Sequence, residues 1–370
     1  MRNTNIEKLR VFEAFSGYGS QSIALRNIGV PYEVVAISEI DKYAIKAYEA
    51  IHGPTLNLGD ISKIKVENIP EHDLFTYSFP CQDISVAGKT RGIIEGETRS
   101  GLLYECKRII EHCKPKYLLL ENVKNLVGKR FKPQFDEWLK YLESLGYTSY
   151  WKVLNAKDYG VPQNRERVFV VSILGEHEPY EFPKNIELEL RLKDMLEDVV
   201  NEKYYVSKEI QDKFRPNKNI KDVIDLPIRL GGLFDTDKGK HQAGSVWDTE
   251  KISPTLDTMQ GGWRQPCIID TTNVIGKLEC KGWYDIETRV HATNGVSPAI
   301  ETRNRGKYMD DNSGRIRKLT PRECFRLMGM NDYDIDKIQQ AGISNTQQYK
   351  MAGNSIVVNV LEAIFKELFL

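Results

Sequence analysis

Short apolar, β-prone segments alternate with helical patterns from the start of the chain to about Gly175. The β-prone segments are 9–15, 33–37, 73–77 and 116–120. This alternation is typical of βαβ units, in which right-handed crossovers bring the carboxyl ends of parallel strands to one edge of a sheet. Open α/β sheets bind their ligands at that edge. We therefore predict an α/β fold with a doubly wound, mostly parallel sheet, and we look for functional residues after each strand.

The alternation stops near a polar break at residues 176–179, and the following part of the chain is glycine-rich and leans toward β structure. A chain of 370 residues exceeds one ordinary core, so two domains are expected. We assign residues 1–178 to a first domain and 179–316 to a second, smaller β-rich domain. Residues 317–370 end in a long apolar helical pattern and are expected to return and complete the first domain.

The composition is that of a globular protein with balanced charge. The 52 basic residues match the 52 acidic ones, which excludes a uniformly basic nucleic-acid binder but allows a local basic face. The six cysteines form no CxxC pair and the six histidines are scattered, so neither a metal site nor a disulfide framework is predicted. No signal peptide or membrane span is indicated. We expect a reduced, cytoplasmic protein that acts as a monomer.

Cys81 follows one of the predicted strands directly. The sequence SFPCQDIS stops the strand at Pro80 and places Cys81 at its carboxyl end, ahead of a glycine-dotted, basic loop that runs to Ser100. A lone cysteine is usually a small buried hydrophobe, so the thiol needs a context to be functional. Glu121 provides one, because it follows the strand 116–120 with a helical pattern in between. Cys81 and Glu121 are therefore expected at the same sheet edge.

The first predicted strand leads into SGYGS at residues 16–20 and then into a helical pattern. Such a turn presents backbone N–H groups to an anionic or polar ligand. Glu39 ends the second strand, at the position where nucleotide-binding α/β folds place an acid on ribose hydroxyls. These two features together favour an adenosine-containing cofactor. Asp60 either accepts a hydrogen bond from an adenine amino group or caps a helix.

Two further features are a pair of arginines and an internal repeat. Arg165 and Arg167 precede an apolar strand, and an arginine entering a core strand is usually paired or directed at a ligand. The sequence VWDTEKISPTLDT at 246–258 recurs as VHATNGVSPAIET at 290–302, and each copy leads into a polar, glycine-containing tip. The copies are either two stabilising hairpins or two loops that present amides and guanidinium groups to base edges and phosphates.

A basic cluster lies around a predicted helix that is capped by Thr320 and begins at Pro321. Its cations form either a solvated helix face or a set of phosphate contacts. The members of the cluster are Arg315, Arg317, Lys318, Arg322 and Arg326.

Taken together, these residues resemble the DNA cytosine-5 methyltransferases. The chain carries motifs similar to those of the family, in the family's order, everywhere outside its variable region. Within that region, KYYVS near Lys203 and the Ser-Pro-Thr-Leu repeat are similar to phage or mobile-element members. The shared motifs are FSGYG at 15–19, PCQ at 80–82, ENV at 121–123, QNRERVF at 163–169, RKLTPRECFRLMG at 317–329 and GNS at 353–355.

The resemblance implies a methyl transfer from S-adenosylmethionine to carbon 5 of a cytosine that is flipped out of double-stranded DNA. Cys81 would add to carbon 6, Glu121 would bind ring nitrogen 3 and the exocyclic amine, and Arg165 and Arg167 would organise both groups and the base carbonyl, with Arg167 favoured for the base. The cofactor would contact Phe15, Gly17, Gly19, Glu39, Ile40, Asp60, Ile61, Pro80, Leu102, Asn354 and Ser355.

The resemblance also implies that the second domain recognises the target sequence and that a restriction endonuclease can act separately beside the enzyme. Gln242 would fill the stack vacated by the flipped base. The residues expected to contact DNA are Gln82, Ser85, Lys89, Arg91, Gln242, Gln260, Gly261, Gly262, Arg264, Arg303 and Arg305.

Three other readings remain open. The tRNA-methylating branch of the same family shares the fold and chemistry but lacks a large variable domain. A non-catalytic DNA-binding module has no need of an exposed thiol, so the intact Cys81, Glu121 and both arginines argue against it. Assignment to the Rossmann dehydrogenases would account only for the glycine turn and Glu39, and for none of the other motifs.

Overall fold

The computed structural model describes residues 8–80, 84, 99–213, 215–216, 226–237, 239–259, 263–270, 274–277, 289–292, 308–310 and 315–370. The chain divides into two compact units. Unit 1 comprises residues 1–161, 165–189 and 328–370, and unit 2 comprises residues 162–164 and 190–327.

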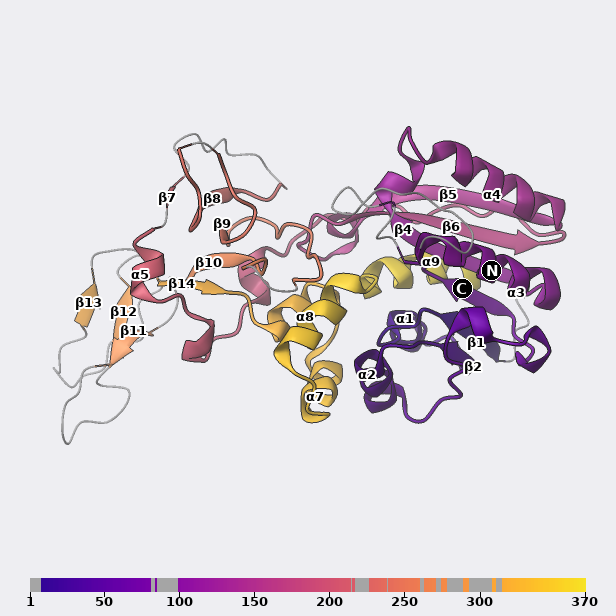
Figure 1. Cartoon of the computed structure of the whole chain (residues 1–370), viewed down its shortest axis with the longest axis horizontal. Helices are drawn as coiled ribbons and strands as arrows, with labels where there is room; N and C mark the ends of the chain where they lie inside the picture. Colours follow the sequence, from indigo (N-terminus) through magenta and orange to yellow (C-terminus); the bar gives the residue numbers. More distant parts are fainter. Residues whose placement is uncertain are drawn as a thin grey trace. The chain divides into compact units, whose positions relative to one another are not determined.

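Unit 1 is built on a six-stranded sheet with the strand order β2-β1-β3-β4-β6-β5 (Figure 1). The first four strands in this order are parallel to one another. Strand β6 is antiparallel to its neighbour β4, and β5 is antiparallel to β6. The strands are β1 (Leu9–Ala14), β2 (Tyr32–Ser38), β3 (Leu74–Tyr77), β4 (Tyr117–Val123), β5 (Tyr147–Asn155) and β6 (Glu166–Leu174).

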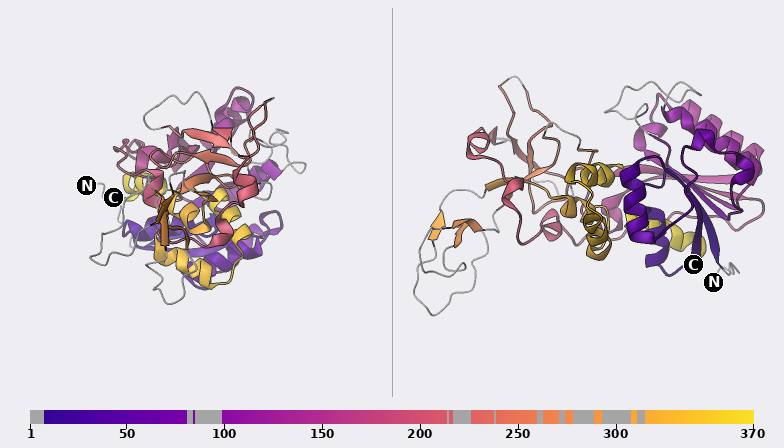
Figure 2. Two further views of the ribbon diagram at one scale, coloured as in Figure 1. Left: turned by 90° about the vertical axis from the view of Figure 1, so that its left-hand side faces the viewer. Right: turned by 60° about the horizontal axis from the view of Figure 1, so that its bottom comes forward.

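Helices lie on both sides of this sheet (Figures 1 and 2). Strands β1, β3 and β4 are therefore buried almost throughout, as continuous apolar runs in parallel sheets usually are. The last helix packs against α1, and the ring of its Phe369 meets Tyr117 edge-to-face at 5.2 Å. The helices of unit 1 are α1 (Ser20–Asn27), α2 (Lys42–His52), α3 (Leu103–Cys113), α4 (Lys132–Ser144), α7 (Asp332–Gln340), α8 (Asn345–Asn354) and α9 (Val358–Phe369).

Unit 2 contains a five-stranded sheet, β14-β10-β9-β8-β7, and a three-stranded sheet, β11-β12-β13. The core of the five-stranded sheet consists of Val206, Leu233, Val246, Cys267 and Ile316. Its strands are β7 (Arg215–Pro216), β8 (Arg229–Gly232), β9 (Ser245–Trp247), β10 (Cys267–Asp270) and β14 (Arg315–Lys318); the other sheet contains β11 (Val274–Lys277), β12 (Arg289–Ala292) and β13 (Tyr308–Asp310). The described part of unit 2 also contains the short helices α5 (Lys208–Gln211) and α6 (Pro321–Arg326).

The predicted fold class, a mostly parallel α/β sheet with a smaller β-rich domain, is confirmed. The boundaries between the units fall after Glu189 and Leu327, whereas the sequence placed them after residues 178 and 316. The second shift has a clear cause, because β14 pairs with β10 and thereby holds the start of the expected return segment in unit 2.

Two predicted elements need correction. The strand expected at 116–120 continues to Val123, so Glu121 lies within β4 and not after it. The sequence of residues 192–199 also predicts a short helix, but the structure has only a 3₁₀ turn there, Leu192–Met195. The turn ends at Leu196, whose backbone is extended (ψ 154°), and the carbonyls of Met195 and Leu196 accept hydrogen bonds from Arg326.

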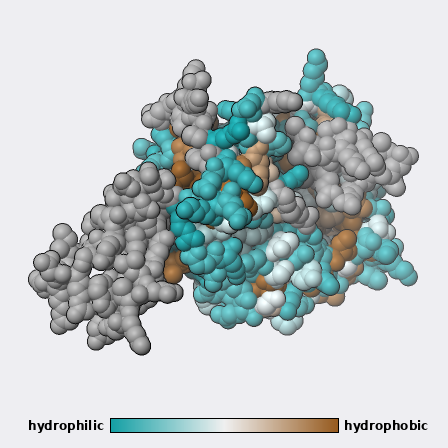
Figure 3. Space-filling view, turned by 60° about the vertical axis from the view of Figure 1, so that its left-hand side comes forward, coloured by the Kyte–Doolittle hydropathy of each residue, from teal (hydrophilic) through white to brown (hydrophobic). Residues whose placement is uncertain are grey.

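Hydrophilic residues dominate the face drawn in Figure 3, where the hydrophobic residues form small separate groups. Scattered groups of this size are ordinary on protein surfaces. Within the described residues, no helix is long and apolar enough to span a membrane.

Candidate active site

Glu121 and Arg167 form an ion pair on two neighbouring strands. Strands β4 and β6 are antiparallel, with Glu121 opposite Phe169 and Val123 opposite Arg167. The Arg167 Nε lies 3.2 Å from Oε1 of Glu121, and both side chains are largely buried. Burial raises the pKa of Glu121, while the charges of Arg167 and Arg165 and a hydrogen bond from Ser78 oppose the rise. Glu121 therefore holds a proton more readily than an exposed glutamate does.

Arg165 has a different set of partners. Its Nη2 donates to the backbone carbonyls of Gly353 and Ser355, both at 2.8 Å, and only 3% of the residue is exposed. The guanidinium thus fixes the segment between α8 and α9. Its charge also lowers the pKa of Glu121, although less than that of Arg167 does. The two arginines therefore have different partners: Arg167 pairs with Glu121, and Arg165 binds the backbone of the GNS segment at 353–355.

Cys81 lies outside the described residues, but the chain on either side of it is anchored beside Glu121. Asn122 Nδ2 donates to the carbonyl of Phe79 at 3.0 Å, and the Ser100 hydroxyl donates to the carbonyl of Pro80 at 2.7 Å. Strands β3 and β4 pair in parallel up to Tyr77 and Leu120. The chain just before Cys81 is thus held next to the strand that carries Glu121, and the expected proximity of Cys81 to Glu121 stays a prediction because Cys81 lies outside the described residues.

A third anchor holds the chain three residues beyond Cys81. Asn125 Nδ2 donates to the carbonyl of Ile84 at 2.5 Å, and Ile84 is fully buried. Sequence reasoning missed Ser100, Asn122 and Asn125. Only Asn122 carried a signal, as a polar residue near the end of an apolar strand.

The glycine turn after β1 adopts left-handed backbone conformations and lies next to Glu39. Phe15, Gly17 and Gly19 have φ values of 56°, 57° and 83°. Glu39 accepts hydrogen bonds from the backbone N–H groups of Gly17 at 3.0 Å, Ile40 at 2.8 Å and Asp41 at 2.9 Å. A carboxylate held in this way is fixed in position and remains able to accept further hydrogen bonds.

Gly19 is required for the packing of α2 against the turn. A Cβ atom at this position would lie 2.5 Å from His52 Nε2 and 2.7 Å from Tyr48, so only glycine allows α2 to approach the turn. The Gly19 N–H is also used internally, because it donates to the carbonyl of Ser16. The Ser16 hydroxyl is buried and has no partner among the described residues, which leaves it available to a polar ligand.

The other residues predicted to contact the cofactor differ in their exposure and in their contacts. Asp60 caps a 3₁₀ turn through Ser62, so the capping alternative is confirmed. Ile61 is part of the hydrophobic core, and Leu102 packs against that core. In contrast, 73% of Ile40 is exposed, and Asn354 is exposed at the end of α8.

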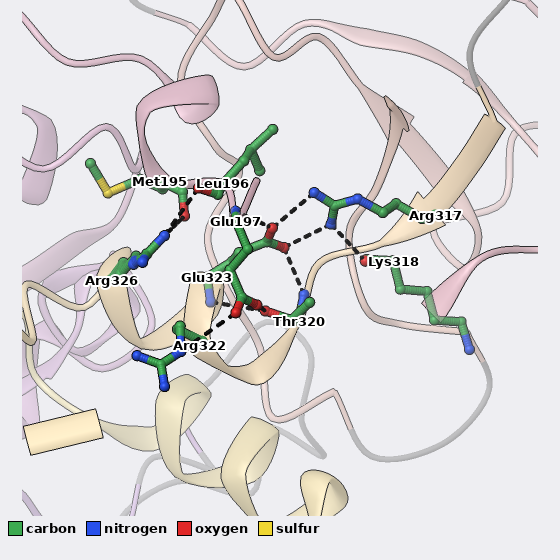
Figure 4. Close-up of polar contacts among 9 residues, drawn as sticks. All are labelled: Met195, Leu196, Glu197, Arg317, Lys318, Thr320, Arg322, Glu323 and Arg326. Atoms are coloured by element: carbon green, nitrogen blue, oxygen red, sulfur yellow. Dashed lines mark hydrogen bonds and ion pairs between the residues drawn. The ribbon is translucent and has the colours of Figure 1, made fainter. Parts of the chain in front are cut away.

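The basic cluster around α6 makes its contacts within unit 2 (Figure 4). Arg317 is fully buried and forms a bidentate ion pair with Glu323, which also completes the capping box of Thr320. Both alternatives, a solvated helix face and a phosphate contact, are therefore wrong for Arg317. The other members bind carboxylates, carbonyls or a ring: Arg315 with Glu202, Arg322 with Glu197, Arg326 with Met195 and Leu196, and Lys318 with Trp263.

Most of the predicted DNA contacts lie outside the described residues. Two are described, and both are exposed: Gln242 accepts from Ser245 through its carbonyl, and Arg264 lies 3.9 Å from Asp257. The described residues contain no group of side chains that could hold a metal ion. The predictions outside the described residues are Gln82, Ser85, Lys89, Arg91, Gln260, Gly261, Gly262, Arg303 and Arg305.

Residues 9–370 match the family model of the C-5 cytosine-specific DNA methylases. The chain belongs to this family. It is thus a DNA (cytosine-5-)-methyltransferase, as its motifs indicated. It is 39% identical to the type II methyltransferase M2.ScrFI of Lactococcus lactis subsp. cremoris, over 415 aligned positions that cover 98% of this chain and 99% of the relative. It is 35% identical to the orphan methyltransferase M.SPBetaI of Bacillus phage SPbeta, with 98% of each chain covered.

The methyltransferase shares its fold with distant solved structures. The Entamoeba histolytica methyltransferase EhMeth matches with a TM-score of 0.68 at 18% identity, and 98% of each chain is covered. The S. pombe Dnmt2 methyltransferase matches with a TM-score of 0.65 at 20% identity, covering 98% of this chain and all of the other. These similarities support the fold.

Proposed function

We propose that the chain methylates carbon 5 of a cytosine within a specific short sequence of double-stranded DNA, through a covalent adduct between Cys81 and carbon 6 of the flipped-out base. The observation that carries the proposal is the buried Glu121–Arg167 pair beside the anchored Pro80. This arrangement places a protonatable acid, a cation and the residue before a thiol at one sheet edge, where α/β folds bind substrates.

The thiol of Cys81 is the nucleophile in this proposal. Carbon 5 of cytosine is too weak a nucleophile to take up a methyl group unaided. Addition of the Cys81 thiolate to carbon 6 creates an enamine whose carbon 5 is nucleophilic. After methylation, loss of the proton on carbon 5 and departure of the thiolate restore the aromatic ring.

Glu121 activates the base. A carboxyl group whose burial favours the protonated form can donate to ring nitrogen 3 and accept from the exocyclic amine. Both interactions withdraw electrons as the thiolate adds, and they distinguish cytosine from thymine. Arg167 orients the carboxyl group through its 3.2 Å contact and supplies a cation near the base carbonyl.

The turn after β1 fits S-adenosylmethionine, which supplies an electrophilic methyl group when bound. The Ser16 hydroxyl offers a buried polar group, and a Cβ at Gly17 would meet open space. Glu39 is fixed by three N–H groups and suits ribose hydroxyls, and the exposed Ile40 offers an apolar surface to adenine. Arg165 holds the backbone around Asn354, the residue that would complete the pocket.

We assign target recognition to unit 2 and base insertion to Gln242. The exposed side chain of Gln242 is suited to fill the stack vacated by the flipped base. If Gln242→Ala leaves binding to matched and mismatched target bases unchanged, this role is removed. The relatives include type II and orphan phage methyltransferases, so the activity fits either a restriction-modification pair or a lone enzyme acting in the cytoplasm. We propose that the enzyme acts as a monomer.

Trapping with a modified substrate tests the mechanism. A 5-fluorocytosine in the target sequence permits addition and methylation, but the fluorine cannot leave as a proton does. The protein should then remain covalently joined to DNA, with the bond at Cys81 in the digested peptide. A bond at Cys106 or Cys113 would contradict the assignment, as would the lack of a covalent complex on a substrate that is methylated when unmodified.

A further inference from the structure

The side chain of His52, the last residue of α2, reaches the glycine turn after β1. Its Nε2 lies 3.0 Å from the backbone carbonyl oxygen of Tyr18, the residue between Gly17 and Gly19. The ring and the turn are packed closely, since a Cβ atom on Gly19 would lie 2.5 Å from the same nitrogen. His52 thus contacts the backbone at the centre of the turn, although it lies 34 positions further along the chain.

This contact is a hydrogen bond that the imidazole donates. Burial lowers the pKa of His52 to about 4, although the bond to Tyr18 opposes this shift. At neutral pH the ring is therefore uncharged and carries a single N–H group. A carbonyl oxygen can only accept a hydrogen bond, so we assign the proton to Nε2.

The imidazole ring is itself held in place. It packs on the ring of Tyr48, one turn earlier in α2, with the ring centroids 4.5 Å apart. Tyr48 is fully buried, and its hydroxyl lies 3.4 Å from the Ser22 hydroxyl, which donates to Glu13 at 2.7 Å. These contacts connect His52 to α1 and β1, the two elements that flank the turn.

The turn needs such support because its backbone conformation is unfavourable. Phe15 has a φ of 56°, in the left-handed region that residues other than glycine rarely adopt. Glu39 holds Gly17 by accepting its N–H at 3.0 Å. His52 holds the next residue, Tyr18, through its carbonyl. Two successive residues are therefore fixed by side chains from outside the turn.

We infer that His52 is a positioning residue for the cofactor, which holds the turn in its binding conformation by donating its Nε2–H to the carbonyl of Tyr18. This inference rests on the proposed binding of S-adenosylmethionine at the turn. A binding loop that is ordered in advance loses less conformational entropy when its ligand binds. His52 acts through Tyr18 and needs no contact with the cofactor.

A cavity of about 370 Å³ beside His52 makes a chemical test possible. Tyr48 and His52 are among the residues that line it. Removal of the imidazole would enlarge a space that already exists. A small ring compound can then take the place of the missing side chain.

His52→Gly tests the inference when the missing ring is supplied as one of two isomers. 4-Methylimidazole and 1-methylimidazole have the same size, and both are neutral at about pH 8.5. With its methyl group in the place of Cβ, the first presents an N–H to the Tyr18 carbonyl, whereas the second presents a lone pair. Two quantities are measured on the full chain: the affinity for S-adenosylmethionine by calorimetry, and amide hydrogen exchange of residues 15–20 without the cofactor.

His52→Gly should bind S-adenosylmethionine about tenfold more weakly and exchange faster in the turn, as expected from the loss of one hydrogen bond of ordinary strength. 4-Methylimidazole should restore both properties, and 1-methylimidazole should not. Unchanged affinity and exchange in His52→Gly would overturn the inference. Equal restoration by the two isomers would overturn it too, because the ring would then only fill space, and so would restoration by neither.

A second pair of variants covers the case in which His52→Gly does not fold. His52→Gln keeps an N–H at about the distance of Nε2 from the backbone, and His52→Met has a similar length without a donor. His52→Gln should retain the affinity of the intact chain for S-adenosylmethionine within about threefold, whereas His52→Met should lose about tenfold. Equal affinities of these two variants would contradict the role of the N–H.

The inference and the proposed function can fail separately. If the intact chain does not bind S-adenosylmethionine, the proposed function fails first. If S-adenosylmethionine binds with equal affinity whether or not the N–H at position 52 is present, only the inference fails.

Discussion

The Nε of Arg167 lies 3.2 Å from Oε1 of Glu121, and the pair joins two antiparallel strands, β4 and β6, beside the strand β3 that ends at Tyr77. Burial and the guanidinium act in opposite directions on the acid. Burial raises the pKa of Glu121, and Arg167 opposes that rise. The site therefore has an acid that can hold a proton next to a cation that keeps its carboxyl group in a fixed orientation.

Glu121→Gln should slow methyl transfer by about 10²–10⁴-fold, the usual contribution of a positioned proton donor. The amide keeps the shape of the side chain but cannot supply the proton to ring nitrogen 3. Single-turnover methylation measures the effect, with DNA affinity as the control. A variant within threefold of the wild-type rate constant would exclude Glu121 as the acid.

Arg165→Met and Arg167→Met should affect different steps. Loss of Arg165 removes two hydrogen bonds from a charged donor, each worth roughly 1.5–3 kcal/mol, so the Gly353–Ser355 segment loosens and cofactor affinity falls at least tenfold. Loss of Arg167 should leave that affinity unchanged and lower the rate constant of methyl transfer. Calorimetric titration with S-adenosylmethionine and single-turnover kinetics separate the two. Identical profiles for the two variants would contradict the division of roles.

Stability should depend on pH through Glu13, a buried residue outside the active site. Burial raises its pKa to about 7, although Ser22 donates a hydrogen bond to it. The folded state binds the proton more tightly than the unfolded state. The contribution of Glu13 to the free energy of unfolding is therefore fully present below the pKa of the unfolded state. It is lost as the pH rises through the pKa of the folded state.

Glu13→Gln tests this dependence. Between pH 4 and pH 8 the free energy of unfolding of the wild type should fall by on the order of 3 kcal/mol from this group. The variant should lack that contribution. Denaturant unfolding at several pH values measures it, and parallel curves for the two proteins would refute the role of Glu13.

The buried Arg317–Glu323 pair should be sensitive to the loss of one partner. Arg317→Met leaves Glu323 charged and buried, and breaking such a pair costs about 3–5 kcal/mol. The double variant Arg317→Met/Glu323→Gln removes the stranded charge while an amide oxygen still accepts from Thr320. It should recover a substantial part of the loss. Urea unfolding followed through the tryptophans of unit 2 measures the cycle, and a double variant less stable than Arg317→Met would be inconsistent with this explanation.

The parts of the site that follow from local patterns could be predicted from the sequence. Apolar runs located the strands, and polar residues at their ends located Glu121 and Glu39. The partners of Arg165 could not be predicted, because Gly353 and Ser355 lie far along the chain and contribute only backbone carbonyls. The burial of Arg317 could not be predicted either, because a charged side chain is usually exposed and its pairing with Glu323 is a feature of the folded structure.

The strand pairing of the internal repeat in unit 2 could not be predicted from the sequence either. Sequence identity between the copies was visible, but the parallel pairing of β9 with β10 depends on a long-range return of the chain. Local composition therefore suggested hairpins as one alternative. Only the strand pairing shows that each copy is part of more than a hairpin, since β9 pairs in parallel with β10 and β12 pairs in parallel with β13.

The central claim is that Cys81 is the nucleophile of a sequence-specific cytosine-5 methylation of DNA. The most direct test expresses the intact chain and Cys81→Ser in a bacterial host without DNA methylation and maps 5-methylcytosine at base resolution. We expect a mark within one fixed short sequence for the intact chain and no mark for a folded, cofactor-binding Cys81→Ser variant. A mark that persists in Cys81→Ser, or none with the intact chain, would contradict the account.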